Sequence, residues 1–464
     1  MALRTDREKT AHLLRRFGLG ASEAELDYYG KDGYVKAVDL LLSPPADDGF
    51  DIDPSDIRSD LGKRLDLQTL TYWWAARLMA TKAPLRERMT LFWHDHFATS
   101  ADKVKNPQMM LAQNEILRKK GLGKFRDLLG DVSKDPAMLF WLDNQENVKG
   151  KPNENFAREV MELFTLGVGN YSETDVREAA RAFTGWTVRR QKSDDLDKVK
   201  VTFWDRANLH DDGQKTVLGK SGALTGDDVL DVLCANPRSG EYLVEKIWDW
   251  FVYPGASPET LKPFIAKFRE SGLDVSTLLR AIMLSPEFVS DKAERSIVKG
   301  PADVCIVTMR QMGIGALIDE KLDSTGGTGK LARAAMTPAA AATITMKDMG
   351  MWIMYPPDVD GWKNGANWIS TATMVARIAW SDRIFGQTAK VRFPIRYPAK
   401  AVLGKAQTPE EIVDRLISVF DAPIKPERKV VLIEAATKAG TKNLAETAAA
   451  VSRLIFAAPE FQFC

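Results

Sequence analysis

The run from Pro152 to Gly167, called the polar run below, gathers residue types that can do chemistry into one predicted short helix. It contains three glutamates, one arginine, two asparagines and one threonine. Helical spacing sorts its side chains into two neighbouring stripes. The apolar stripe contains Phe156, Val160 and Leu163, and the polar stripe contains Asn155, Arg158, Glu159, Glu162 and Thr165.

The polar stripe has two interpretations. Arg158 and Glu162 lie four residues apart, so they can pair on a solvated helix face. Alternatively, the stripe faces a cleft, where Glu159 and Glu162 would act as metal ligands or as acid–base groups. Pro152 suits the start of the helix and Gly167 suits its end.

Histidine is the other candidate for this chemistry, and the chain has four. A helix is predicted to begin near Pro84, because apolar residues then recur at helical spacing up to Phe97. His96 continues that apolar face, so it should point inward, either as a core histidine or as a metal ligand or general base. His94 lies two residues away and should point elsewhere.

A further histidine belongs to a predicted turn. Gly213 and two aspartates mark a turn over residues 208–213, between β-like segments at 199–203 and 215–219. His210 and Asp211 therefore lie on a loop, where functional groups are common, with Lys215 just beyond them. The alternative is a histidine that only stabilises the turn through a hydrogen bond.

A second helix should follow the polar run. Ser172 is its predicted N-cap, and Asp175 three residues on forms a weak capping box. Arg181 would clamp Glu159 or Glu162 across the helix pair, or bind an anion, since guanidinium matches carboxylate and phosphate. The core face of this helix should contain Val176, Ala180 and Phe183.

These segments resemble the bacterial family called domain of unknown function 1800. The resemblance rests on the polar run, on its continuation to Trp186, and on shorter segments that come in the family's order. In some members of that family a histidine stands at the position of Phe164. The shorter segments are residues 12–18, 92–97, 135–139, 210–211 with Lys215, 356–362 and 459–462.

The resemblance covers nearly the whole chain but implies little chemistry, because the family has no settled activity. It implies an exported or envelope protein encoded beside a sulfatase-like partner protein. The sequence alone favours the cytoplasm, because residues 1–9 lack the apolar segment of a signal peptide. Export together with a signal-bearing partner is the alternative that the resemblance implies.

The composition agrees with a soluble globular protein. With 464 residues the chain exceeds the usual single core, and 27% charged and 45% hydrophobic residues are ordinary for folded proteins. A net charge of +1 without a basic stripe argues against a nucleic-acid partner. No apolar stretch reaches the ~18 residues of a membrane-spanning helix, so no membrane insertion is expected. Three widely spaced cysteines predict free thiols.

Periodicity along the chain predicts a mainly α, multi-helical fold with one small β-hairpin element. Residues 1–220 should form an N-terminal helical region with the polar cleft, residues 221–300 a helical unit, and residues 301–464 a C-terminal helical region. Residues 278–288 resemble residues 451–461, which indicates a helical unit used twice. The glycine-rich segment 324–330 should be a flexible loop.

Residues 354–368, called the aromatic loop below, should not be helical, because Pro356 and Pro357 interrupt a helix. Tyr355, Trp362 and Trp368 beside Asp and Asn suit stacking on a carbohydrate or a lid over a cleft. The alternative is a packed structural corner, because tryptophans bury much area wherever they lie.

Two hypotheses for the function remain open. In the first, the chain is an enzyme, a metal-dependent hydrolase whose catalytic groups are Glu159, Glu162, His96 and His210. The cofactor would be a divalent metal held by His96, Glu162 and His210, and such ligands suit zinc, manganese or iron alike. The residues predicted to bind or orient are Asn155, Arg158, Arg181, Asp211, Lys215, Trp186 and Trp362.

In the second hypothesis, the chain is a non-catalytic binding or assembly protein, associated with a glycan or with the cell envelope. Its polar stripe would then be an ion-pair network. The two hypotheses differ in what must converge in space. The first requires His96, Glu162 and His210 in one site, and the second requires each carboxylate to be paired with an arginine without an open cleft.

Overall fold

Many helices of the chain begin at a side chain that caps the first turn. Thr5, Ser22, Ser172, Thr225 and Thr408 each accept a hydrogen bond from the backbone N–H three residues further on. The acidic residue at that position bonds back to the capping residue's backbone, which completes a capping box. The N-cap predicted at Ser172 is therefore confirmed.

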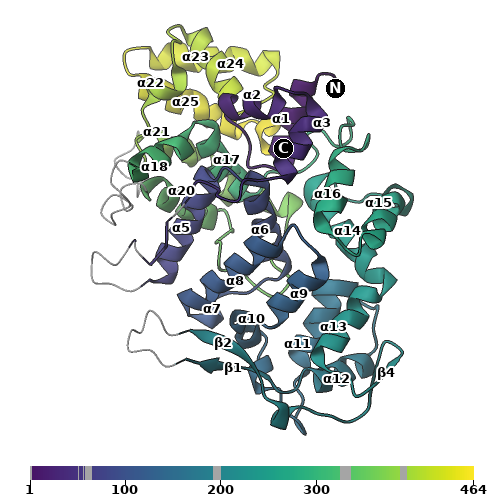
Figure 1. Cartoon of the computed structure of the whole chain (residues 1–464). Helices are drawn as coiled ribbons and strands as arrows, with labels where there is room; N and C mark the ends of the chain where they lie inside the picture. Colours follow the sequence, from purple (N-terminus) through teal and green to yellow (C-terminus); the bar gives the residue numbers. More distant parts are fainter. Residues whose placement is uncertain are drawn as a thin grey trace.

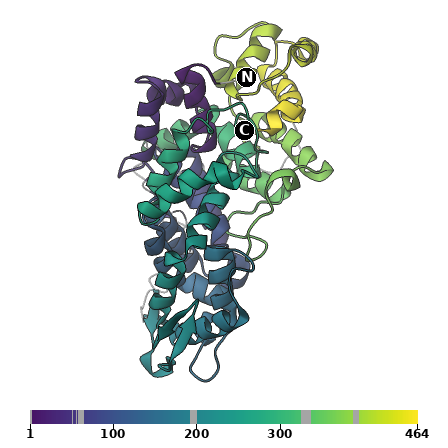
Figure 2. The ribbon, with the colours of Figure 1, turned by 90° about the vertical axis from the view of Figure 1, so that its right-hand side faces the viewer.

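The helices assemble into an elongated molecule (Figures 1 and 2). The computed structural model describes residues 3–50, 52–55, 57, 65–191, 200–323, 336–386 and 394–464, without the side chains of 319–323. The glycine-rich segment 324–330 lies outside the described residues. The mainly α fold class is confirmed, because the sheets among the described residues are two small antiparallel pairs.

The first part of the chain runs from one end of the molecule to the other. Its helices are α1 (Asp6–Arg16), α2 (Glu23–Gly30), α3 (Tyr34–Leu42), α5 (Leu67–Ala80), α6 (Pro84–His96), α7 (Ala101–Val104), α8 (Pro107–Lys120), α9 (Phe125–Ser133), α10 (Pro136–Trp141) and the 3₁₀ turn η1 (Asn144–Glu146). The polar run follows as α11 (Glu154–Glu159) and the π-helix η2 (Val160–Leu166), and α12 (Glu173–Ala182) comes next.

Two small hairpins follow α12 at the end of the molecule that is lowest in Figure 1. The first pairs β1 (Trp186–Arg190) with β2 (Val201–Asp205), and the second pairs β3 (Lys215–Val217) with β4 (Lys220–Gly222), with η4 (Ala207–Leu209) between them. The β-like segments expected on either side of His210 thus belong to different hairpins. The second hairpin turns at Leu218 and Gly219, which both have positive φ, as a tight two-residue turn requires.

The rest of the chain returns to the opposite end, where α22–α25 lie beside α1 and α2 (Figure 1). Its first helices are α13 (Gly226–Ala235), α14 (Pro237–Phe251), α15 (Pro258–Glu270) and α16 (Val275–Met283). Its last elements are α17 (Pro301–Gln311), α18 (Ile314–Asp323), α20 (Thr337–Asp348), η5 (Gly365–Trp368), α21 (Thr371–Phe385), α22 (Ala399–Leu403), α23 (Pro409–Val419), α24 (Pro426–Ala439), α25 (Leu444–Ala457) and η6 (Pro459–Gln462).

Two hydrophobic cores organise these elements. One core joins α1, α3, α9, α11 and α12 to α13–α16, and the other joins α5 to α17, α20, α21 and α23–α25. Helix α6 contributes to both, with Phe92 and Trp93 in the first core and Leu91 in the second. The two similar segments of the sequence lie one in each core, where α16 precedes buried Phe288 and α25 precedes buried Phe461.

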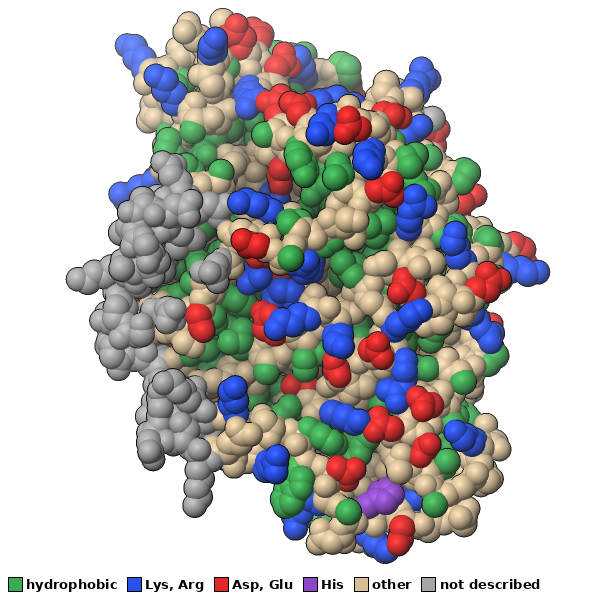
Figure 3. All heavy atoms as spheres, in the orientation of Figure 1, with side chains coloured by type: hydrophobic (Ala, Val, Ile, Leu, Met, Phe, Trp, Pro, Cys, Tyr) green, Lys and Arg blue, Asp and Glu red, His purple; other side chains and the backbone are tan. Residues whose placement is uncertain are grey.

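The visible surface carries charges of both signs, and the cysteines are free thiols. Lys and Arg side chains are interspersed with Asp and Glu over the face seen in Figure 3. Cys234, Cys305 and Cys464 are all free, as their spacing predicts. In the part of the chain that the structure describes, no helix combines the length and the apolar character needed to cross a membrane.

A buried carboxylate ties three helices together. Glu87 on α6 is fully buried and accepts hydrogen bonds from Trp74 Nε1 on α5 at 3.0 Å and from Arg118 Nη2 on α8 at 3.1 Å. Arg77 Nε on α5 lies 3.3 Å from the same carboxylate. Burial would raise the pKa of Glu87, but the charges of Arg118 and Arg77 and the hydrogen bonds from Arg118 and Trp74 together outweigh it, so that the pKa falls below its ordinary value.

We expect Glu87→Gln to lower the free energy of unfolding by about 3–5 kcal/mol, because two buried guanidinium groups then lose their shared counter-charge. Since the pKa of Glu87 is lowered in the folded state, this stabilisation is present above the unfolded pKa and is lost as the pH falls through the folded one. Urea denaturation at pH 7 measures the change.

Glu115→Gln is the matched control, because Glu115 pairs with the same Arg118 from a partly exposed position. Its loss should cost about 1 kcal/mol or less. Equal losses in the two variants would contradict the role given to the buried carboxylate.

Candidate functional site

The last turn of α6 holds three consecutive polar side chains, of which His94 is the first. It is buried, and its Nε2 accepts a hydrogen bond from the backbone N–H of Met354 at 3.1 Å. Burial lowers the pKa of His94 to about 3, so the ring is neutral at pH 7 and carries its proton on Nδ1. Met354 begins the aromatic loop and has a positive φ of 70°, which a non-glycine residue seldom adopts.

His96 contacts a different element, as the spacing of the two histidines predicts. Its Nε2 donates to the backbone carbonyl of Phe164 in η2 at 3.2 Å. Burial lowers the pKa of His96 well below its ordinary value, so this ring is neutral as well. Its Nδ1 is buried and has no hydrogen-bond partner among the described residues. His96 therefore points inward, as expected, and one of its two nitrogens is committed to η2.

Asp95, between the two histidines, anchors the middle of the aromatic loop. Its carboxylate accepts hydrogen bonds from the backbone N–H of Trp362 at 2.7 Å and from Asn364 Nδ2 at 3.3 Å. Gly361 packs directly against it, since a Cβ at that position would lie 2.4 Å from Asp95 Oδ1. Burial raises the pKa of Asp95 to about 6, although both hydrogen bonds and the charge of Lys246 oppose the rise. The sequence prediction omits this residue.

The polar run is not the regular helix that was expected. It begins two residues after Pro152, and η2 replaces its second half until Gly167 ends it with a positive φ. Thr165, predicted to lie on the polar stripe, is fully buried, and its Oγ1 donates to the carbonyl of Val160, five residues back, at 2.7 Å. A π-helix bonds residues that lie five apart and so has wider turns than an α-helix, and Phe164 takes the core position expected for Leu163.

The ion pair expected within the polar run is not formed. Arg158 and Glu162 each have other partners. Arg158 donates instead to Glu173 on α12 at 2.7 and 2.8 Å, and to Glu154 at 3.4 Å. Glu162 accepts a short hydrogen bond from the hydroxyl of Tyr171. The carboxylate of Glu162 is therefore held by a phenol rather than by an arginine.

Charged side chains from α6, the polar run, α14 and the aromatic loop interact with one another. We call this set the acidic cluster, and its members are Asp95, Glu159, Glu162, Lys246 and Asp360. Glu159 is half-buried, and its pKa is raised by burial and by the neighbouring charge of Glu162. Lys246 is the cation of the cluster. Burial lowers its pKa, and the charges of Asp95 and Asp360 oppose that change. Two of the four carboxylates, Asp95 and Asp360, thus act on the lysine.

His210 lies in a different part of the structure, at the end of α12. Its Nδ1 donates to the backbone carbonyl of Thr184 at 3.0 Å. Lys215, which is buried, donates from Nζ to the carbonyl of Gly213 at 3.0 Å. Both side chains therefore stabilise the turn between the two hairpins.

Arg181 joins the same corner, so its predicted clamp on Glu159 or Glu162 is wrong. Its Nε and Nη2 donate to the two carboxylate oxygens of Asp211 at 2.8 and 3.1 Å, and its Nη1 donates to Glu178 at 2.6 Å. The hydrogen bonds from Arg181 lower the pKa of Asp211 to about 2. The guanidinium faces the hairpin side of α12, where Asp211 lies, and this leaves it no contact with the polar run.

The three predicted metal ligands are not assembled into one site. His96 and His210 bond to the carbonyls of Phe164 and Thr184, and Glu162 bonds to Tyr171. Across the described ranges, no three His, Cys, Asp or Glu side chains are grouped so that they could hold a metal ion. The catalytic roles proposed for these residues stay predictions.

Two other predicted binding residues contribute to packing. Asn155 donates from Nδ2 to the carbonyl of Leu142 at 3.2 Å. Trp186 is only 3% exposed and packs edge-on against Phe183 and Phe203 at ring distances of 5.2 and 5.5 Å. Neither side chain reaches the aromatic loop through a recorded contact.

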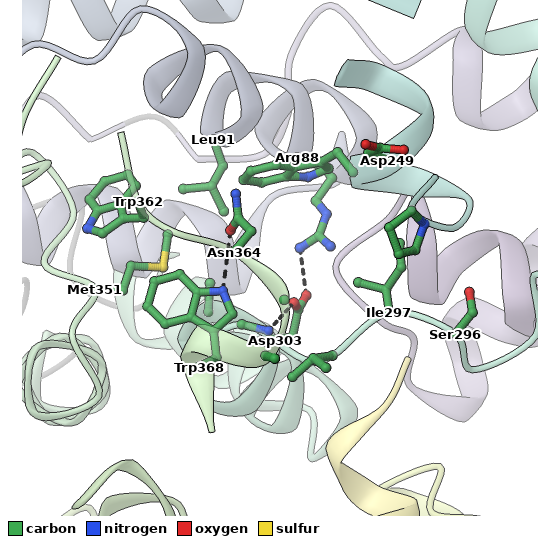
Figure 4. Close-up of a pocket in the computed structure, with 17 residues that line it drawn as sticks. Arg88, Leu91, Asp249, Ser296, Ile297, Asp303, Met351, Trp362, Asn364 and Trp368 are labelled. Carbon is green, nitrogen blue, oxygen red and sulfur yellow. Dashed lines mark hydrogen bonds and ion pairs between the residues drawn. The ribbon is translucent and has the colours of Figure 1, made fainter. Parts of the chain in front are cut away.

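The aromatic loop borders an open cleft of about 380 Å³, which we call the tryptophan cleft (Figure 4). Trp362 and Trp368 of the loop line it, together with Trp250 from α14. The two loop tryptophans are only 5% and 6% exposed, so the loop is a packed element that also forms a wall of the cleft. Further apolar lining comes from Leu91 and Met351.

The tryptophan cleft has few polar groups, and most of them are held in place by hydrogen bonds or ion pairs with each other. Arg88 on α6 and Asp303 on α17 form an ion pair with an N–O distance of 2.6 Å. Asn364 accepts a hydrogen bond from Trp368 Nε1 at 3.3 Å through Oδ1, and its Nδ2 reaches Asp95 (Figure 4 shows the bonds within the cleft). Asn364 therefore connects the tryptophan cleft with the acidic cluster.

Comparison with known families decides where the chain belongs. A family model described as "Protein of unknown function (DUF1800)" matches residues 12–463. The chain belongs to the DUF1800 family. The match includes α6, the polar run and the aromatic loop, so the resemblance recognised from separate segments is confirmed. This DUF1800 protein has no match among curated proteins and none among solved structures.

In this DUF1800 protein, we expect Gly361→Ala to destabilise the fold more than Gly365→Ala. Both glycines have positive φ, of 79° and 67°, so either replacement should cost about 1–2 kcal/mol from the backbone alone. Only the first brings a Cβ against Asp95, which should add about 1–3 kcal/mol, whereas nothing lies within 4 Å at the second. Urea unfolding of both variants gives the difference. If it is zero, Asp95 does not hold the loop as described.

Asp95 should also make the stability of this DUF1800 protein depend on pH. Its folded pKa of about 6 lies above the ~3.9 of an unfolded aspartate, so the folded state binds the proton more tightly. The free energy of unfolding should therefore fall as the pH rises from about 4 to about 6, by about 2 kcal/mol relative to Asp95→Asn. Urea denaturation at four pH values checks this. In Asp102→Asn, which removes an exposed aspartate, the free energy of unfolding should depend on pH as it does in the wild type.

Proposed function

We propose that the protein binds glycans and that the tryptophan cleft receives one sugar unit. The observation that carries this proposal is the meeting of three indole rings with oriented polar groups in one open cleft. A cleft of about 380 Å³ with mainly apolar and aromatic walls and a few polar groups is typical of small-molecule sites.

A sugar ring matches these walls chemically. One face of a pyranose carries C–H groups that pack on an indole, and its rim carries neighbouring hydroxyls that both donate and accept. Tryptophan offers an apolar face and one N–H donor, which suits a ligand that is apolar on one side and wet on the other. Arg88, Asp303 and Asn364 supply planar donor and acceptor groups for adjacent hydroxyls.

The proposal is tested with a glycan array and two variants that change the cleft without touching its ion pair. Ala366→Trp places a large side chain at an exposed position of the lining, and Trp250→Ala removes one wall. We expect wild-type protein to bind a defined set of glycans, and both variants to lose at least tenfold in affinity. Titration calorimetry with the best glycan gives the dissociation constants.

Trp204→Ala is the matched control, because Trp204 is 41% exposed on β2 and does not line the cleft. It should bind as the wild type does. An array without any signal above the Ala366→Trp background would overturn the proposal. If the wild type then binds an apolar fluorescent dye and Ala366→Trp does not, the cleft takes an apolar ligand.

Acid–base catalysis is a second candidate, favoured by the raised pKa of Asp95. Its carboxyl group is bonded to Trp362 and Asn364, which line the cleft, and a pKa of about 6 suits proton exchange near neutral pH. A hydrolysed glycan would release reducing sugar with wild type and not with Asp95→Asn, while both bind equally. Unchanged glycan in both incubations would leave binding alone as the function. A metal ion is not part of this candidate.

A further inference from the structure

A second cavity, of about 390 Å³, is lined by four arginines and shares no lining residue with the tryptophan cleft. We call it the arginine pocket. It forms where α1 and the start of α2 meet the end of α23 and the residues just after it, with Arg295 completing its wall. These segments are far apart in sequence but share one end of the molecule in Figure 1.

Positive charge is in excess in this pocket. Its lining contains Arg7, Arg15, Arg295 and Arg415, but only two carboxylates, Glu23 and Asp421. Arg415 pairs with Glu23 at 2.9 Å, and Arg7 pairs with Asp27 outside the lining at 2.6 Å. The remaining two arginines share one carboxylate.

That shared carboxylate belongs to Asp421. Arg15 Nε lies 2.6 Å from its Oδ2, and Arg295 Nη2 lies 2.7 Å from its Oδ1. Burial would raise the pKa of Asp421, but the two arginines outweigh burial and hold it below its ordinary range. Burial lowers the pKa of Arg295, and the charge of Arg15 lowers it further. Two arginines thus share the carboxylate of Asp421, and Glu294 is a further negative charge that acts on Arg295.

Three further observations indicate that the excess charge faces a ligand. Nη2 of Arg15 and Nε of Arg295 have no recorded hydrogen bond to a described residue, yet neither atom is sealed in the core. Lys299 lies buried nearby, and burial lowers its pKa to about 8, with the charge of Arg295 adding to the effect. Arg295 and Asp421 both hold positive φ values, of 49° and 48°, and such backbone strain in non-glycine residues concentrates at ligand clamps.

We propose that the arginine pocket binds a small organic dianion, namely a molecule with a terminal phosphate monoester or with paired carboxylates. Guanidinium groups bind both kinds of oxyanion through two parallel hydrogen bonds, which neutral residues and lysine do not reproduce. The cavity has room for more than the anionic group, and Leu26, Ile417 and Val419 offer apolar contact to an organic part. The residues that line this pocket differ from those that line the tryptophan cleft, so the proposal does not rest on glycan binding.

The experiment is titration calorimetry of the whole protein at low salt with inorganic phosphate, phenyl phosphate and phthalate. We expect one equivalent of phenyl phosphate or phthalate to bind more tightly than inorganic phosphate, since only the first two fill the apolar part. Whichever binds identifies the source of the dianion as phosphate or carboxylate.

The test variant is Arg7→Gln with Arg415→Gln, because these two side chains are 57% and 34% exposed and can be changed without disturbing the buried pair. It should weaken binding at least tenfold. Arg280→Gln is the matched control, since Arg280 is also an exposed arginine paired with an aspartate, at 3.0 Å, but lies outside the pocket. It should change affinity by less than twofold.

Three outcomes would overturn the proposal. These are no saturable binding of any of the three anions, equal affinities in the double variant and the wild type, or equal weakening by Arg280→Gln. The last result would mean that the anions bind by general surface charge. Arg15→Lys gives a second check inside the pocket, because it keeps the charge but removes the paired geometry, and should also weaken binding.

Discussion

The last turn of α6 is the constraint on which the candidate site depends. Successive residues of a helix point about 100° apart, so three consecutive side chains must reach three directions. Here His94 bonds to the start of the aromatic loop, Asp95 to its middle, and His96 to the π-helix. The two histidines are buried and Asp95 is partly buried, and each has a hydrogen-bond partner, the condition under which polar groups are tolerated in a core. The tryptophan cleft and the acidic cluster therefore share a single support.

Features that depend on neighbours in the sequence could be predicted, and features that depend on distant partners could not. The cap at Ser172 and the inward face of α6 follow from the spacing of a few residues, and the structure has both. The π-helix has no signature in that spacing, because the hydroxyl of Thr165 that bridges it looks like one more polar-stripe residue. The partner of Arg181 was missed because Asp211 is 30 positions away, beyond any helical rule.

The candidate site was predicted in part. The aromatic loop was recognised from its tryptophans and prolines, and it does border a cleft, although its two tryptophans are also packed. Asp95 was missed because a single carboxylate beside the apolar face of α6 resembles a solvent-exposed residue. Its signal was the pair of histidines on either side, together with Gly361 before Trp362, where the backbone must come close to something. The expected meeting of His96 with His210 failed because residue types do not say which loop folds against which helix.

The contacts that complete both cavities also decide when they can form during protein synthesis. Asp95 and Trp362 are 267 positions apart, and Arg15 and Asp421 are 406 apart. As the chain leaves the ribosome, α6 emerges long before the loop that covers its last turn. In the same way, Arg15 on α1 can pair with Asp421 only after α23 has been synthesised. Pairings of such long range are slow to form and leave apolar surface exposed meanwhile. A nascent chain halted before residue 362 would contain most helices of the site but neither of the two cavities. Synthesis of the last hundred residues is therefore the step that allows the native state to form.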